Sequence, residues 1–288
     1  MQRLWRERRD YLIKRRRTDV QDEYQQCSAI ATGKLYDLHK NSDTKVRLAE
    51  REARRNRRRI KRNKRQDHRD GMSSDDEEVP SRVQTFSASR DKTIDGVTTL
   101  FADIDDEYCE LPRIADHVER WLTEYSESFD QAYVGHCLPK LFGPIVRREI
   151  VAWNPLWDAD AQSITKHRWY TDLMAFSSSN LPQEAPACDV MVEDARIRLI
   201  PAIVEKVICP KIKALVEDTW DCASTSQSSR LVALLRSVVD DYPLIDGRTK
   251  SFAVILEAVV SRLRTSLDDD LFIPLYPKTY VFSVFQKN

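Results

Sequence analysis

Glycine is scarce in this 288-residue chain, at 6 residues, and neither a Gly-rich phosphate loop nor a CxxC pair occurs. The scarcity counts against β-hairpin arrays and collagen-like repeats, and the missing loop counts against a nucleotide-binding motif. The six cysteines are far apart, which predicts neither a disulfide framework nor a zinc site. No run approaches 18 apolar residues, so we expect no membrane-spanning helix. The start, MQRLWRERRDYLIKRRR, lacks the apolar stretch of a signal peptide, so we expect no secretion.

Titratable side chains form no recognisable catalytic or metal-binding pattern. The five histidines are scattered, and none is four residues from another His or a Cys. No GxSxG nucleophile elbow is present. The acidic clusters at residues 103–107 and 268–270 lack the ligand spacing of an EF-hand and are more typical of helix ends. The sequence therefore predicts a protein that is not an enzyme, with no cofactor, metal or small-molecule substrate.

A net charge of zero conceals a strong asymmetry along the chain. Residues 1–70 carry 23 Lys and Arg against 11 Asp and Glu, a net charge of +12, so residues 71–288 carry −12. The contrast is sharpest in residues 45–65, where 12 of 21 residues are basic, and it ends at SSDDEE, residues 73–78. Such an asymmetry indicates either a polyanionic partner for the basic part or contact between the two parts.

The periodicity of apolar residues predicts an all-α protein in three parts. Residues 1–70 are rich in good helix formers and predict helices at about 3–38 and 44–66. This basic helical arm has few apolar residues and no sustained apolar seam, so we expect it to bury little and to project. Residues 71–90 have the composition of an acidic linker. Residues 91–288 predict a domain of antiparallel helices without strands.

Within that domain, apolar residues at helical spacing mark separate segments. They predict helices near residues 97–108, 118–133, 138–146, 200–220, 231–239 and 252–267. Pro139 and Pro144 fit a first turn or a kink better than a helix interior. Pro210 is expected to kink or split the longest of these helices.

The basic run is the strongest candidate for a binding site. Its clustered cations would attract phosphate groups and match a nuclear-localisation signal: Arg54, Arg55, Arg57, Arg58, Arg59, Lys61, Arg62, Lys64 and Arg65. We therefore expect non-specific contact with DNA or RNA through residues 45–65. No leucine heptads follow, so sequence-specific recognition of the bZIP type is not predicted. A surface for protein partners, or a solvated helix without a dedicated partner, remain as alternatives.

Two serines in the linker are candidate phosphorylation sites. Ser73 and Ser74 each have an acidic residue three positions later, which suits an acidophilic kinase. A phosphate would add about −1.5 to −2 charge beside a cationic helix and would tighten any fold-back of the linker on the arm. The alternative is a simple acidic spacer.

Several longer strings carry more than composition. These are EREARRNRRR and GMSSDDEE, then AYVGHCLPKLFGPIVRREIVAWNPL, LIPAIVEKVICPKIKALVEDTWDCASTSQSSRLVALL and RTSLDDDLFIPLYPK. In this order and spacing they resemble the GC-rich sequence DNA-binding factor family, which includes an adaptor for paired-box transcription factors and a spliceosome-associated relative. The stretches 132–156, 199–235 and 264–278 are the specific ones.

The resemblance implies a nuclear, non-enzymatic, mostly helical scaffold that acts in pre-mRNA splicing or in transcription regulation. Its partners would be spliceosome or transcription proteins, and the alternative is a transcription regulator that binds DNA directly. Members of the family continue past the equivalent of LYPK, which predicts a domain truncated at its C-terminal side. Such a domain is expected to leave Phe252, Ile255, Val259 and Leu263 uncovered.

Overall fold

The computed structural model describes residues 1–32, 42–63, 75–178, 196–243, 245 and 249–276. Throughout these residues the chain forms helices and no strand, which confirms the predicted all-α class. The basic N-terminal part forms α1 (Gln2–Ala31) and α2 (Ser42–Asn63), close to the two predicted helices. Helix α3 (Pro80–Leu100) follows, and it begins inside the segment that was interpreted as a linker. Its proline occupies the first turn, where no N–H is needed.

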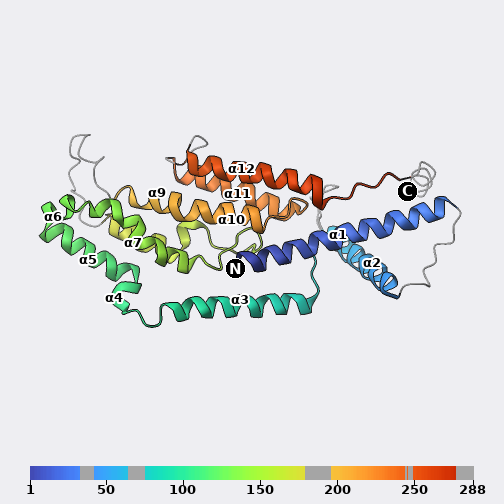
Figure 1. The fold of residues 1–288 in the computed structure, drawn as a ribbon, viewed down its shortest axis with the longest axis horizontal. Helices are drawn as coiled ribbons and strands as arrows, with labels where there is room; N and C mark the ends of the chain where they lie inside the picture. The colour runs from blue at the N-terminus through green and yellow to red at the C-terminus, as the bar shows by residue number, and fades with distance from the viewer. Residues whose placement is uncertain (33–41, 64–74, 179–195, 244, 246–248, 277–288) are drawn as a thin grey trace.

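The remaining helices build the body of the molecule. They are α4 (Asp106–Cys109), α5 (Leu111–Glu124), α6 (Ser126–Gln131), α7 (Val134–Glu149), α8 (Arg168–Ser178), α9 (Leu199–Ile203), α10 (Cys209–Asp218), α11 (Thr225–Asp241) and α12 (Lys250–Thr265). Helices α10 and α12 lie side by side, and α5, α6 and α7 lie at one end of the body (Figure 1). Helix α1 lies against α10 and runs from there toward the opposite end (Figure 1).

Proline determines the irregular stretch between α9 and α10. A π-helical segment, Val204–Ile208, joins α9 to α10 directly before Pro210. Proline lacks the N–H that would bond to the preceding turn, and its ring collides with the carbonyl four residues back, so the helix widens there. The predicted disruption at Pro210 is therefore confirmed. Pro139 and Pro144, in contrast, both lie inside α7.

A single hydrophobic core holds the body together. Its largest fully buried side chains include Trp169, Phe142 and Ile212, and α5, α7, α8, α10, α11 and α12 all contribute to it. Phe252 and Ile255 are buried in this core, so the expectation that they are uncovered is wrong. They lie on the face of α12 that packs against α10, whereas Leu263, on the outer face, is 42% exposed.

Helix α1 is docked against the body and does not project as an arm. Trp5, Leu12, Ile13 and Cys27 are all buried, and Leu12 is completely inaccessible. The expectation that residues 1–70 bury little is therefore wrong for α1. Its few apolar residues were too widely spaced to show an amphipathic seam, yet they suffice for one contact face against α10 and α3. Helix α2 differs, because its Val46 and Ile60 are more than half exposed.

The burial of α1 leads to a testable prediction. Replacing Leu12 by Ala should lower the free energy of unfolding by about 2 to 5 kcal/mol, because the substitution leaves a cavity under α1. Ile60→Ala is the matched control on α2, where the side chain is 58% exposed, and it should change the stability by less than about 0.5 kcal/mol. Urea unfolding followed by circular dichroism measures both. Equal effects of the two substitutions would contradict the docking of α1.

Candidate functional site

The two basic helices are joined by ion pairs in place of an apolar seam. Four arginines of α2 follow the spacing i, i+4, i+7, i+11 and share one face: Arg47, Arg51, Arg54 and Arg58. Carboxylates of α1 meet this face, with Arg47 Nε 3.0 Å from Asp22 and Arg54 Nη2 2.5 Å from Asp19. Arg51 also donates to the Asp19 carbonyl at 3.0 Å. This pairing explains how two strongly basic helices can lie together.

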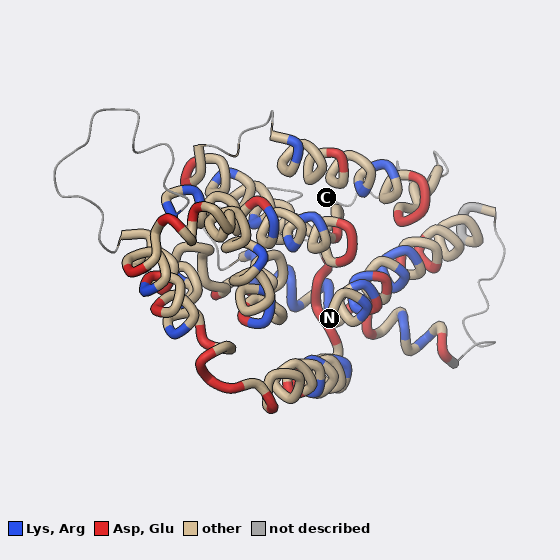
Figure 2. The backbone as a smooth tube through the Cα atoms, turned by 60° about the vertical axis from the view of Figure 1, so that its left-hand side comes forward, with Lys and Arg blue, Asp and Glu red and all other residues tan. Residues whose placement is uncertain are grey.

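An acidic strap, which we define as residues 75–78, closes over this face. The Asp75 carboxylate pairs with three arginines, at 3.1 Å from Arg15 and Arg54 and 2.7 Å from Arg58. Glu77 pairs with Arg57 at 2.7 Å. Figure 2 shows acidic residues running beside the Lys- and Arg-rich helices near the N-terminus. The acidic residues that follow the basic run in the sequence are therefore in direct contact with it in the folded chain.

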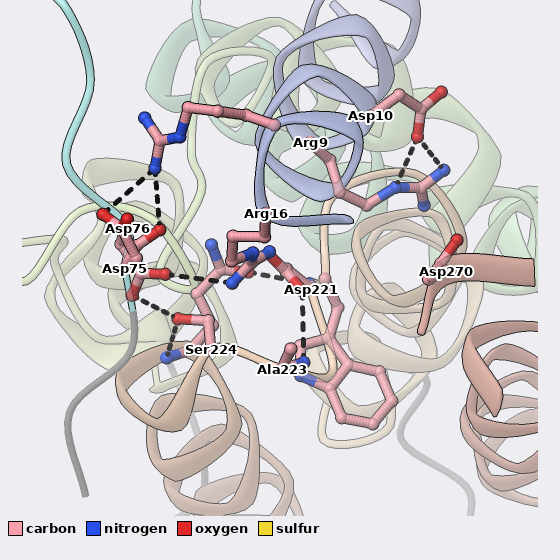
Figure 3. A network of polar contacts seen from close by, with 12 residues as sticks. Arg9, Asp10, Arg16, Asp75, Asp76, Asp221, Ala223, Ser224 and Asp270 are labelled. Atoms are coloured by element: carbon pink, nitrogen blue, oxygen red, sulfur yellow. Dashed lines mark hydrogen bonds and ion pairs between the residues drawn. The ribbon is translucent and has the colours of Figure 1, made fainter. Parts of the chain in front are cut away.

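The strap also connects α1 to the turn between α10 and α11. Arg16 lies between two carboxylates, those of Asp76 on the strap and Asp221 on the turn (Figure 3). The Ser224 hydroxyl donates to Asp76 at 2.7 Å and caps α11 by accepting from the Gln227 N–H. The Asp221 carboxylate is almost fully buried, at 2% side-chain exposure. One arginine therefore joins three separate segments.

Arg8 anchors the end of the strap. Its guanidinium lies over the rings of Trp157 and Phe86, 3.8 Å and 4.4 Å from their centroids, and pairs with Glu78. A guanidinium suits this position because its planar face stacks on aromatic rings while its edge donates to the carboxylate. Trp5 packs beside Phe86, with centroids 4.7 Å apart. The strap, α1, α3 and the loop after α7 therefore meet at one cluster.

Cations of α1 also meet the end of α10. Arg6 donates to the Asp218 carboxylate at 3.0 Å, and Arg9 donates to the Glu217 carbonyl at 2.5 Å. The last carbonyls of a helix lack internal partners and carry partial negative charge, so basic side chains are favoured there. The Asp218 carboxylate raises the pKa of Arg6 further above its ordinary value. These contacts orient α1 along the body.

The acidic partners respond differently to burial. Burial alone would raise the pKa of Asp75, but Arg15, Arg58 and Arg54 outweigh this effect and the pKa lies below its ordinary value. Burial raises the pKa of Asp19, and its pairing with Arg54 offsets this only in part. Asp75 is therefore the carboxylate whose charge the basic helices stabilise most clearly.

The structure divides the basic residues that the sequence singled out. Arg54, Arg57 and Arg58 pair with the strap, and Arg54 is only 7% exposed. Four further cations of α2 make no ion pair with any described residue: Arg55, Arg59, Lys61 and Arg62. Lys64, Arg65, Ser73 and Ser74 lie outside the described residues.

Sequence reasoning missed the arginines of α1. Arg8, Arg15 and Arg16 carry as much of the strap contact as α2 does, but no short motif marks them. The available signal was the opposite charge of the two parts of the chain, which allowed contact between them without identifying its residues.

The acidic clusters have structural roles. Asp105 caps α4 by accepting from the Glu107 N–H at 3.3 Å. Asp270, in a π-helical extension of α12 (Ser266–Asp270), pairs with Arg262 at 2.5 Å. Among the described residues no three His, Cys, Asp or Glu side chains are grouped as metal ligands. No described helix combines the length and the apolar character that a membrane crossing requires.

A cavity of about 380 Å3 lies between α3 and the helices α5, α7 and α8. Its carboxylates are engaged in local structure. Glu149 accepts hydrogen bonds from the N–H groups of Arg168 and Trp169, both at 2.9 Å, and so caps α8. Asp172, whose pKa burial raises, pairs with Arg168 at 3.5 Å. These groups hold the start of α8 in position and do not form a set of nucleophile, base and orienting residue.

Comparison with known proteins defines the family. The model of the family described as GC-rich sequence DNA-binding factor-like protein matches residues 111–272, more than half of the chain. The chain therefore belongs to this family, as its strings of residues had predicted.

Individual relatives are longer than this chain. The chain is 35% identical to the human PAX3- and PAX7-binding protein 1 over 96% of its own length and 31% of that protein. It is 32% identical to the mouse Intron Large complex component GCFC2, over 74% of this chain and 27% of that protein. It is 28% identical to the transcriptional repressor ILP1 of Arabidopsis thaliana, over 52% and 16%. The chain thus spans about a third or less of these relatives.

The central carboxylate of the strap can be tested by an isosteric change. Asp75→Asn should lower the free energy of unfolding by about 3 to 5 kcal/mol, because Arg15, Arg54 and Arg58 lose the charge that they surround. Asp91→Asn, at a carboxylate that is more than half exposed and pairs with Arg90, should have an effect below about 0.5 kcal/mol. Denaturant titration at neutral pH measures both, and equal effects would argue against the strap.

The effect of Asp75→Asn on the free energy of unfolding should also depend on pH. Because the pKa of Asp75 is lowered on folding, its charge stabilises the fold above the ordinary value of 3.8 and loses this effect as the pH falls through the lowered pKa. The difference in unfolding free energy between the native chain and Asp75→Asn should therefore shrink below pH 3.8. Unfolding curves between pH 5 and pH 2 measure it, and a difference that grows in acid would contradict the assignment.

Proposed function

We propose that this protein is a nuclear, non-enzymatic scaffold that acts in pre-mRNA splicing or transcription regulation through contacts with other proteins. The names of its relatives, a PAX3- and PAX7-binding protein, an Intron Large complex component and a transcriptional repressor, support this role. The helical body supports this role as well. Its charged groups cap helices and pair with one another, which are structural roles. Its partners would be nuclear proteins of splicing or transcription complexes.

The observation that carries this proposal is the strap. It pairs with Arg15 of α1 and Arg54 of α2, and it meets the body where Arg8 and Arg16 contact Trp157 and Asp221; all four arginines are largely buried. A surface built from both parts can therefore keep a fixed shape, which a partner protein requires. A freely moving arm would offer only charge.

Phosphate contact and nuclear import would then use the cations of α2 that have no ion-pair partner among the described residues. We assign these roles to Arg55, Arg59, Lys61 and Arg62, together with Lys64 and Arg65 in the sequence that follows. Arg54, Arg57 and Arg58 would contribute less, because the strap neutralises them. The expected affinity for DNA or RNA is sequence-independent and depends on salt.

Phosphorylation of Ser73 or Ser74 would act on the strap, which begins at the next residue. An additional charge of about −1.5 to −2 beside the arginines of α1 and α2 would strengthen a contact that already exists without phosphate. The modification would therefore make the docked arrangement more stable and is not required to create it.

The role of these four cations of α2 can be tested by replacing Arg55, Arg59, Lys61 and Arg62 together by Ala. If all four contact phosphates, the slope of log affinity for duplex DNA against log salt should fall by about 3 to 4, since each contact contributes roughly 0.9. Fluorescence anisotropy at several salt concentrations measures this slope, and thermal unfolding should remain unchanged.

The matched control removes four exposed cations outside the two basic helices: Lys92, Arg120, Lys140 and Lys206. This control changes the net charge by the same amount as the α2 variant. It should leave the slope of log affinity against log salt mostly unchanged. Equal losses in the two variants would show that only total charge matters. A strong preference for one duplex over unrelated ones at physiological salt would instead favour the alternative, a regulator that binds DNA directly.

The scaffold role can be tested by crosslinking and affinity capture from nuclear extract. We expect spliceosome components or promoter-bound complexes to be recovered, and their identity decides between splicing and transcription. The Asp75→Asn variant should recover less of them, because it loosens the basic helices from the body. Capture of nucleic acid alone, abolished by nuclease, would contradict a scaffold.

A further inference from the structure

Helix α12 has a second apolar face that nothing in the described structure covers. Its outward apolar side chains follow the spacing i, i+4, i+7, i+11 and continue into the π-helical extension: Leu256, Val260, Leu263 and Leu267, at 40%, 46%, 42% and 64% exposure. We call these four residues the α12 stripe. This is the repeat of a two-helix seam, in which positions three and four apart alternate.

The stripe is accessible to another helix. Ile255 and Ala258 lie on a different side of α12 and are buried in the core, as is Phe252 one turn before Leu256, so apolar side chains line more than one side of this helix. Figure 1 shows α12 at the edge of the molecule, with the body on one side only. A helix that is apolar all round normally has neighbours on both sides.

The charges beside the stripe indicate what the neighbour is. Glu257 and Arg264 each follow a stripe residue by one position and therefore lie on the same flank, seven residues apart. Both are exposed, and neither has an ion-pair partner among the described residues. Their separation is too large for them to pair within one helix, which favours pairs three or four residues apart.

Pairing with a second α12 in antiparallel orientation satisfies both charges at once. When Leu256 meets Leu267 of the other copy, Val260 meets Leu263, and Glu257 comes beside Arg264 in two equivalent pairs. The acidic residues Asp268 and Asp269 then lie toward Lys250, at the start of the other helix. A parallel arrangement would place this flank of the two copies on opposite sides of the seam, so that Glu257 and Arg264 could not meet.

We propose that the α12 stripe is a self-docking surface, on which a second copy of this chain packs its own α12 antiparallel about a two-fold axis. This property goes beyond the proposed scaffold function, which does not depend on it. A single helix pair buries less than a standard interface of about 1,600 Å2, so the association is weak and depends on concentration.

Charge reversal tests both the surface and the orientation. Glu257→Arg and Arg264→Glu, made singly, each place like charges in both pairs and should raise the dimer dissociation constant by about tenfold. The double variant restores opposite charges and should return the constant to that of the native chain. Sedimentation equilibrium of the 288-residue chain over a wide concentration range measures all four proteins, and circular dichroism verifies the fold.

The control reverses an exposed charge far from the stripe, Asp91→Arg, and should leave the constant unchanged. Val260→Asp should abolish the dimer. A chain that stays monomeric at every concentration would overturn the proposal, as would single and double reversals that behave alike. The proposal would also be overturned if the chain is monomeric and binds a different protein through the stripe. In that case Val260→Asp would abolish the binding of that protein.

Discussion

The contact between the acidic strap and the arginines of α1 and α2 is the constraint on which the arrangement of the N-terminal part depends. Residues 1–70 carry a net charge of +12, and two helices of that composition repel one another in isolation. Carboxylates of α1 neutralise one face of α2, and Asp75 then enters between Arg15, Arg54 and Arg58. The oppositely charged parts of the chain therefore bind each other in the fold. Only the charged side chains left unpaired by this contact are available to partners.

This contact determines geometry more than it adds stability. Charges that leave water lose hydration, and the attraction within a buried pair recovers little more than that loss. The net stabilisation of α1 therefore comes from Trp5, Leu12 and Ile13, which are removed from water against the body. The arginines decide where α1 and the strap lie, because each planar guanidinium accepts only a few orientations of its partners. Arg16, held between Asp76 and Asp221, is the clearest example.

The local sequence pattern was sufficient to predict the helices, but it was insufficient to predict how they contact one another. The all-α class, the two basic helices and the distortion at Pro210 follow from propensity and from the missing proline N–H, which act within one or two turns. The docking of α1 did not follow, because Trp5 and Leu12 are separated by polar residues and show no seam. The strap did not follow either, since its partners in α1 lie 60 to 70 residues away in the chain. Only the charge asymmetry indicated that they could meet.

Contacts between distant parts of the chain also explain why a count of basic residues overestimates the positive charge that α2 exposes. Twelve cations in residues 45–65 predict a positive potential on every side of the helix, but the strap and α1 remove it from the face of Arg47, Arg51, Arg54 and Arg58. What remains is the positive charge of Arg55, Arg59, Lys61 and Arg62, on a helix whose orientation the paired arginines fix. A helix held in this way can present phosphate-binding groups at a defined angle to the body. If these cations bind phosphate as proposed, we expect an affinity for polyanions below the one that the composition of α2 suggests, because the strap neutralises Arg54, Arg57 and Arg58.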